Sequence, residues 1–274
     1  MIKLLDAGFT RLRKNKLFWI LLSFIILFAL YVNFINYSNM KNYSATIDFG
    51  NFPFYYPTMI GVVIAIFTSL FLGVEYSDGI IRNKISIGHK RINIYLSNLI
   101  IITVTSLVSY ILYLGVVSSI GIPLFGTDGL VFKELIIRIL ITFVTIIVYS
   151  SIFTFLASVI SNKTITAIVS IIFAFLLMMV ALTCFNVLES PKYINEVTMI
   201  NGETKIEQVL NPKYPSEKKR KIYQYLLDIN PAGQMYQIAG RNTSDLKIFP
   251  LYSLGIIIVF TTTGLVIFKK KELK

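Results

Sequence analysis

Cysteine and histidine are nearly absent from this sequence. The chain has one cysteine, Cys184, inside an apolar run, and one histidine, His89, inside a basic stretch. A single cysteine cannot form an intrachain disulfide, and neither residue has the neighbours from which a zinc site is built. No HExxH motif or paired-histidine spacing occurs either. We therefore expect no metal and no other cofactor on this chain, and a metalloenzyme is disfavoured.

Charged residues are scarce as well. They make up 15% of the chain, while hydrophobic residues make up 55%, and a soluble domain carries about 25% charged residues. The apolar residues lie in blocks about as long as the roughly 20 residues that a helix needs to cross a bilayer. The sequence therefore predicts an all-α integral membrane protein in which residues 1–274 form one transmembrane domain.

Six blocks are predicted to be transmembrane helices. Their approximate bounds are Leu17–Asn36, Pro57–Val74, Ile92–Val117, Leu135–Ile160, Ile165–Phe185 and Ile248–Phe268. At the start of the fourth block, Glu134 and Arg138 lie one turn apart and are expected to pair. Arg138 is also expected to extend toward the lipid headgroups. Six helices alone are too few to enclose a pathway across the membrane, so we expect the chain to form a dimer.

Basic residues outnumber acidic ones, 26 to 14, and gather at the ends of the apolar blocks. In a soluble protein this excess would indicate nucleic-acid binding. Beside membrane spans it indicates membrane orientation and anionic lipid, so we expect membrane lipids and no nucleic acid as partners. If both termini are cytoplasmic, the short basic connections between the spans all lie on the cytoplasmic side of the membrane. We therefore predict that both termini are cytoplasmic. The basic run 218–221 then lies outside, in a loop of about sixty residues, and loops of that length translocate regardless of charge.

Residues 1–16 are predicted to form an amphipathic helix at the cytoplasmic membrane interface. A signal peptide is the alternative, but the apolar run that follows is too long and lacks a cleavage site of small residues. The apolar side consists of Ile2, Leu5, Phe9 and Leu12, and the polar side of Lys3, Asp6, Arg11, Arg13 and Lys14.

One strongly charged segment, residues 75–97, joins the second and third spans. Within it, Ile81, Ile85 and Gly88 share one face of a predicted helix, and Gly88 permits a turn. Such a helix can rest on lipid headgroups or dock into a groove on a partner. A solvated basic loop is the simpler alternative.

Glu75, at the start of this segment, is expected to pair with Arg82 or Lys84. Its simpler role is to cap or pair locally. In the more specific interpretation it anchors the segment 75–97, called here the connector, so that a force applied outside the membrane is transmitted to the second span.

The connector resembles the segment that follows the second span in permeases of the ABC-2 family, the membrane subunits of bacterial ABC transporters. The residues that carry the resemblance are Glu75, Gly79, Arg82, Lys84, Gly88, Arg91 and Tyr95. The similarity extends more weakly over the six-span layout. In that family the segment is the coupling helix, which sits in a cleft of the ATP-binding subunit. The resemblance therefore implies that ATPase coupling involves Glu75, Gly79, Arg82, Lys84, Gly88 and Arg91, within residues 75–91.

The longest polar region, residues 186–247, is predicted to be extracellular. Apolar residues at helical spacing before Asn230-Pro231, and again up to Gly240, predict two short helices. Permeases similar to the ABC-2 family carry short re-entrant helices before the last span. The resemblance thus suggests an outer gate that includes Asn230, Pro231 and Gly233, while an ordinary capped extracellular region remains the alternative.

The sequence lacks common nucleotide-binding and catalytic motifs. No Walker A motif occurs, and Gly88-His89-Lys90 lacks both its earlier glycine and its Ser/Thr. No GxSxG or kinase motif occurs, and the apolar blocks contain no carboxylate of the kind that proton-coupled carriers use. We therefore expect a chain that is not an enzyme, with ATP and Mg²⁺ on a separate subunit.

The resemblance implies the permease subunit of an ATP-driven exporter in the bacterial cell membrane. Two cytosolic ATPase subunits and a second permease, identical or different, would be its partners. An amphipathic peptide, a toxin or antimicrobial, or a lipid-like cargo suits apolar spans better than an ion does. The alternative is a membrane sensor or a membrane-embedded enzyme that needs no ATPase.

Overall fold

The computed structural model describes residues 1–43, 47–127, 131–160, 162–200, 203–212, 214–240 and 246–271, apart from the side chains of 197–200 and 203–207. Six helices in it are long and apolar enough to cross a membrane, which confirms the predicted spans. They are α2 (Lys16–Tyr43), α3 (Tyr55–Ser77), α5 (Arg91–Phe125), α6 (Phe132–Val159), α7 (Lys163–Glu189) and α10 (Phe249–Lys270).

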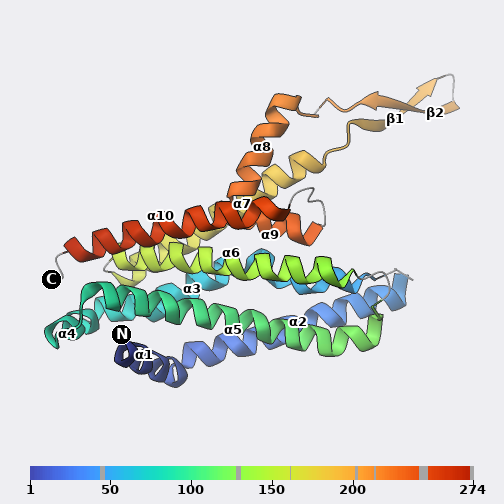
Figure 1. Ribbon diagram of the computed structural model, residues 1–274. Helices are drawn as coiled ribbons and strands as arrows, with labels where there is room; N and C mark the ends of the chain where they lie inside the picture. Colours follow the sequence, from blue (N-terminus) through green and yellow to red (C-terminus); the bar gives the residue numbers. More distant parts are fainter. Residues whose placement is uncertain are drawn as a thin grey trace.

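The bundle has two distinct ends (Figure 1). One end, called here the termini end, carries α1 (Ile2–Lys14), α4 (Ile80–Ser86) and the C-terminal end of α10. The other, called here the hairpin end, carries α8 (Glu217–Ile229), α9 (Pro231–Gly240) and a hairpin of strands β1 (Tyr193–Ile200) and β2 (Glu203–Leu210). Two short 3₁₀ helices, η1 (Phe49–Phe54) and η2 (Leu246–Ile248), precede α3 and α10.

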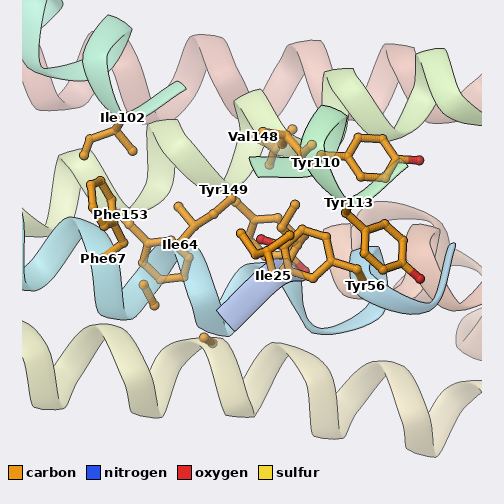
Figure 2. Packing of buried hydrophobic residues seen from close by; sticks show 14 of the residues in the cluster. Ile25, Tyr56, Ile64, Phe67, Ile102, Tyr110, Tyr113, Val148, Tyr149 and Phe153 are labelled. Carbon is orange, nitrogen blue, oxygen red and sulfur yellow. The ribbon is translucent and has the colours of Figure 1, made fainter. Parts of the chain in front are cut away.

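Helices α3 and α6 form the centre of the bundle. In each, 61% of the most apolar segment is buried, against 22% in α2 and α7 and 17% in α10. Aromatic side chains of α3, α5 and α6 pack together in the core (Figure 2), where Tyr56, Tyr113 and Tyr149 are almost wholly buried. The Tyr113 hydroxyl donates to the carbonyl of Phe52 at 2.7 Å, so its polar atom is satisfied inside an apolar core.

Helix α5 is longer than predicted. The third span was predicted to end at about Val117, before the turn-forming Gly121 and Pro123, but the helix continues to Phe125 and ends at Gly126. The Phe125 ring packs edge-on against Phe52, with centroids 5.1 Å apart. Tertiary packing against η1 thus outweighs local turn preference in this stretch.

The two short helices predicted before the last span are present as α8 and α9, and α8 ends just before Asn230-Pro231 as expected. The hairpin of β1 and β2 was not predicted. Its strands pair antiparallel from Tyr193–Leu210 to Ile200–Glu203. The sequence places Asn201-Gly202 between them, and that dipeptide is the strongest short-range hairpin signal.

Two glycines of α10 allow a matched test of this packing. A Cβ built on Gly264 would lie 2.2 Å from the Tyr95 hydroxyl, whereas one on Gly255 would meet nothing within 4 Å. We expect Gly264→Ala to destabilise the protein by about 1–3 kcal/mol through overpacking. Gly255→Ala should be neutral or slightly stabilising. Thermal unfolding in detergent measures both, and equal effects would contradict this account of the α5–α10 contact.

Candidate functional site

Glu75 is the point at which four helices meet at the termini end. Helix α3 continues past it to Ser77, and its side chain is buried, with the residue 3% exposed. Its Oε1 atom accepts hydrogen bonds from Arg11 of α1 and, at 2.7 Å, from Lys84 of α4. Its Oε2 atom accepts from Asn98 of α5 at 3.1 Å. One carboxylate therefore ties α1, α4 and α5 to α3.

The predicted pairing of Glu75 is confirmed for Lys84 and is wrong for Arg82, whose side chain lies exposed on α4. Because Lys84 lies on the bundle side of this short helix, it reaches the carboxylate, and Arg82 points outward. Two cations, Arg11 and Lys84, thus flank one anion. Removing the anion would leave both without compensation.

Arg11 was predicted to lie on the polar side of the N-terminal helix, and in the structure its side chain packs against α3. Its guanidinium lies 3.9 Å from the centroid of the Phe71 ring and donates to the Phe71 carbonyl at 2.6 Å. The buried face of α1 consists of Leu4, Gly8 and Leu12, and Arg11 borders it. Burial lowers the pKa of Arg11 and the charge of Glu75 opposes this shift, so the guanidinium stays charged.

Helix α4 is bounded by two glycines in the left-handed region, Gly79 (φ 71°) and Gly88 (φ 96°). The turn predicted at Gly88 is confirmed. Ile81 is buried in a small apolar cluster with Leu4, Ile94, Tyr95 and Phe268. The opposite side carries exposed Arg82 and, just after the helix, Ile87, which is 78% exposed. Thus α4 is fixed to the bundle on one side and presents a mixed cationic and apolar side to its surroundings.

Arg91 holds the last turn of α10 instead of facing outward. Its Nη1 atom donates to the carbonyls of Phe268 at 3.1 Å and Lys269 at 3.4 Å, and also to that of Lys271. These carbonyls lack partners within their helix, and the negative end of the helix dipole favours a cation there. Lys271 in turn donates to the Ser158 and Val159 carbonyls at 2.8 and 2.9 Å. The C-terminal ends of α6 and α10 and the start of α5 are therefore joined.

The predicted coupling residues therefore have different structural roles. Glu75 and Lys84 are bonded to each other, and Gly79 and Gly88 bracket α4. Arg82 is exposed, and Arg91 caps α10. Sequence reasoning missed Arg11, Asn98 and Lys271. Asn98 carried the clearest available signal, because an amide in an apolar run needs a polar partner; the other two stand among many basic residues at span ends.

At the hairpin end, the predicted gate residues form the corner between α8 and α9. The Asn230 side chain accepts from the Ala232 amide at 3.0 Å and donates to the Leu177 carbonyl at 2.8 Å. Pro231 occupies the first position of α9, where its missing N–H costs nothing. A Cβ on Gly233 would lie 2.2 Å from the Leu227 carbonyl oxygen, so only glycine allows this close approach. Each of the three has a local structural role.

A polar network lies behind this corner. The Gln234 side chain accepts from Thr145 of α6 at 3.2 Å and from Ser253 of α10 at 3.0 Å, and donates to the Asp228 carbonyl at 2.8 Å. The Asp228 carboxylate accepts from Gln224 and Gln237 at 2.7 and 3.0 Å. Helix α9 is thereby bonded to two spans and to α8.

Arg138 also contacts α9, which corrects the prediction that it extends to the lipid headgroups. The residue is 4% exposed, and its pairing with Glu134, at 2.5 Å, is confirmed. Its Nη1 atom donates to the Ile238 carbonyl at 3.2 Å, near the C-terminal end of α9. Helix α9 covers this arginine and supplies the acceptor, so the side chain has no need to reach the headgroups.

An apolar groove of about 530 Å³ runs between three spans. Its walls come from α2, α3 and α7, and it is lined by Leu17, Ile20, Leu21, Phe24, Met59, Val62, Val63, Ile66, Phe67, Leu70, Phe175 and Met178. Ile20, Phe24 and Phe175 are exposed at its edges. The groove opens sideways from the bundle and offers a surface for an apolar chain.

Comparison with protein-family models gives no match for this chain, and neither does comparison with curated protein sequences.

The bond between Arg11 and Glu75 can be tested against a neighbour on the same helix. Arg11→Gln should lower the free energy of unfolding by roughly 1–3 kcal/mol, because it leaves a buried carboxylate with fewer donors. Arg13→Gln, at an exposed side chain, should change it by less than about 0.5 kcal/mol. Chemical denaturation in a neutral detergent measures both. If the two variants lose equal stability, the carboxylate does not depend on Arg11.

Proposed function

We propose that this chain is the membrane subunit of an ATP-driven exporter, with α4 as the element that an ATPase subunit engages. The observation that carries the proposal is the construction of α4. It is a short helix outside the apolar spans, anchored to α3 through Lys84 and Glu75, and it presents Arg82 and Ile87 outward. Because α3 and α5 flank it directly, a force on α4 is transmitted to two membrane helices.

The distribution of charge supports an orientation in which the termini end is cytoplasmic. The short segments at this end are rich in basic residues, as the positive-inside rule requires of short cytoplasmic segments, whereas most basic residues of the hairpin end lie in the long region 186–247. The basic residues at the termini end include Lys3, Arg11, Arg13, Lys14, Lys16, Arg82, Lys84, Lys90, Arg91, Lys163, Lys269, Lys270 and Lys271. The exposed side of α4 would then lie where a cytosolic ATPase is present, with ATP and Mg²⁺ bound to that subunit.

The apolar groove supports an amphipathic or lipid-like cargo and a second permease subunit. Its walls belong partly to α2 and α7, which are among the least buried spans. A second copy or a related chain placed against these spans would close the groove into a pathway lined by apolar side chains. Peptides, toxins, antimicrobials and lipids all carry the apolar surface that such a pathway accommodates.

The test is co-purification with an ATPase that carries a Walker A motif and is sought in the neighbouring reading frames. Arg82→Glu combined with Ile87→Asn changes only exposed side chains of the connector and should reduce ATPase retention at least tenfold, since it reverses a charge and removes the apolar contact. Lys269→Glu makes the same change in net charge at the same end of the bundle and should leave retention unchanged. Retention on an affinity-tagged permease is quantified by gel densitometry, with ATP hydrolysis as a second measurement.

The possible outcomes separate the alternatives. If the wild-type chain retains no ATPase, the exporter proposal fails and an ATP-independent sensor or membrane enzyme becomes the leading hypothesis. If the connector variant retains the ATPase as well as the wild type does, α4 is not the contact. Arg91 is left unaltered because its substitution would release the end of α10 and confuse binding with folding.

A further inference from the structure

Helix α1 has a second face that the contacts with α3 and α5 leave free. Its buried side is used by Leu4, Gly8, Leu12 and Arg11. The opposite side contains a depression of about 330 Å³ lined by Phe9, Thr10, Arg13 and Lys14. Arg13 and Lys14 are exposed, so two positive charges and a hydroxyl surround this hollow.

The neighbouring Trp19 indicates that the depression lies near a membrane surface. Trp19, in the first turns of α2, is 55% exposed and donates from its indole nitrogen to the Arg13 carbonyl at 2.9 Å. Tryptophan with an apolar ring and a satisfied N–H is typical of the headgroup level of a bilayer. Lys16 adds another exposed positive charge at the joint between the two helices. Asp6, one turn from Thr10, is the one acidic residue in the sequence of α1.

We propose that this depression binds the phosphate headgroup of an anionic phospholipid in the leaflet at the termini end. Arg13 and Lys14 supply the charge that complements the phosphate, and Thr10 supplies a hydroxyl donor. Phe9 is half-buried against the main core, and its exposed part contacts the glycerol and upper acyl region. The acyl chain continues past Trp19 along the start of α2. Lipid with a zwitterionic headgroup lacks the net charge that two cations select.

Headgroup binding acts on the same helix that carries Arg11. A lipid held by Arg13 and Lys14 on one side of α1 stabilises the position from which Arg11 reaches Glu75 on the other. Lipid binding and the Arg11–Glu75 bond are then thermodynamically linked, each favouring the other. That this linkage adjusts the coupling segment rests on the proposed function, whereas the lipid site itself does not.

The single tryptophan makes the site directly measurable. The full chain is placed in nanodiscs that contain increasing fractions of phosphatidylglycerol or phosphatidylcholine with brominated acyl chains, which quench tryptophan fluorescence on contact. We expect brominated phosphatidylglycerol to quench Trp19 at a lower mole fraction than brominated phosphatidylcholine. Arg13→Gln with Lys14→Gln should reduce this preference by up to about 30-fold, since each basic residue near an anionic surface contributes roughly fivefold.

The matched control is Lys269→Gln with Lys270→Gln, which removes the same charge from exposed positions at the same end of the bundle. It should keep the wild-type preference. The proposal is overturned if the two brominated lipids quench equally in the wild type, or if the control loses the preference as fully as the α1 variant does. It is also overturned as a lipid site if inorganic phosphate binds with the same affinity and displaces phosphatidylglycerol.

None of these measurements uses an ATPase. If phosphatidylglycerol binds at α1 and the co-purification fails, the lipid site stands and only the exporter proposal falls. Unchanged unfolding of the α1 variant in neutral detergent confirms that a lost preference reflects lost lipid binding.

Discussion

A buried carboxylate at the end of a membrane helix is stable only while its cations and donors stay in place, and Glu75 imposes this constraint on the termini end. Its partners come from α1, α4 and α5. If any one of these helices moved away from α3, the buried carboxylate would lose one of its three donors, which costs about 1–3 kcal/mol. The positions of the N-terminal helix and of the connector are therefore determined together.

Polar contacts at the two ends of the bundle differ in composition. At the termini end they involve full charges, such as Arg11 with Glu75 and Arg91 with the carbonyls of α10. At the hairpin end, α9 is held by amide and hydroxyl groups around Gln234 and also by two charged groups, the Arg138 guanidinium and the Asp228 carboxylate. Between them, the core consists of aromatic and aliphatic side chains (Figure 2). Charge-assisted hydrogen bonds are about twice as strong as neutral ones, so the neutral contacts around α9 are the weaker constraint.

The spans, the two short helices before the last span and the turn at Gly88 could be predicted from the sequence, because each depends on local composition or a local breaker. The partners of Glu75 could be predicted only in part. Lys84 is near in sequence, but Arg11 and Asn98 reach the carboxylate through the packing of α1 and α5 on α3, which no local pattern encodes. Arg138 was misplaced for the same reason, since α9, distant in sequence, covers it. The hairpin carried a signal, Asn201-Gly202, that was overlooked.

The least buried span, α10, is held by hydrogen bonds near both of its ends. Most of its apolar segment is not buried by the rest of the chain, but Arg91 binds its last carbonyls and Ser253 bonds to Gln234 near its start. Packing against lipid gives a helix little positional preference, because lipid chains are as apolar as its own side chains. The location of α10 therefore depends on those two sets of bonds and on its contact with α6. Arg91 starts the helix that follows α4, so any shift of the connector that moves Arg91 also acts on α10, and through Ser253 on α9.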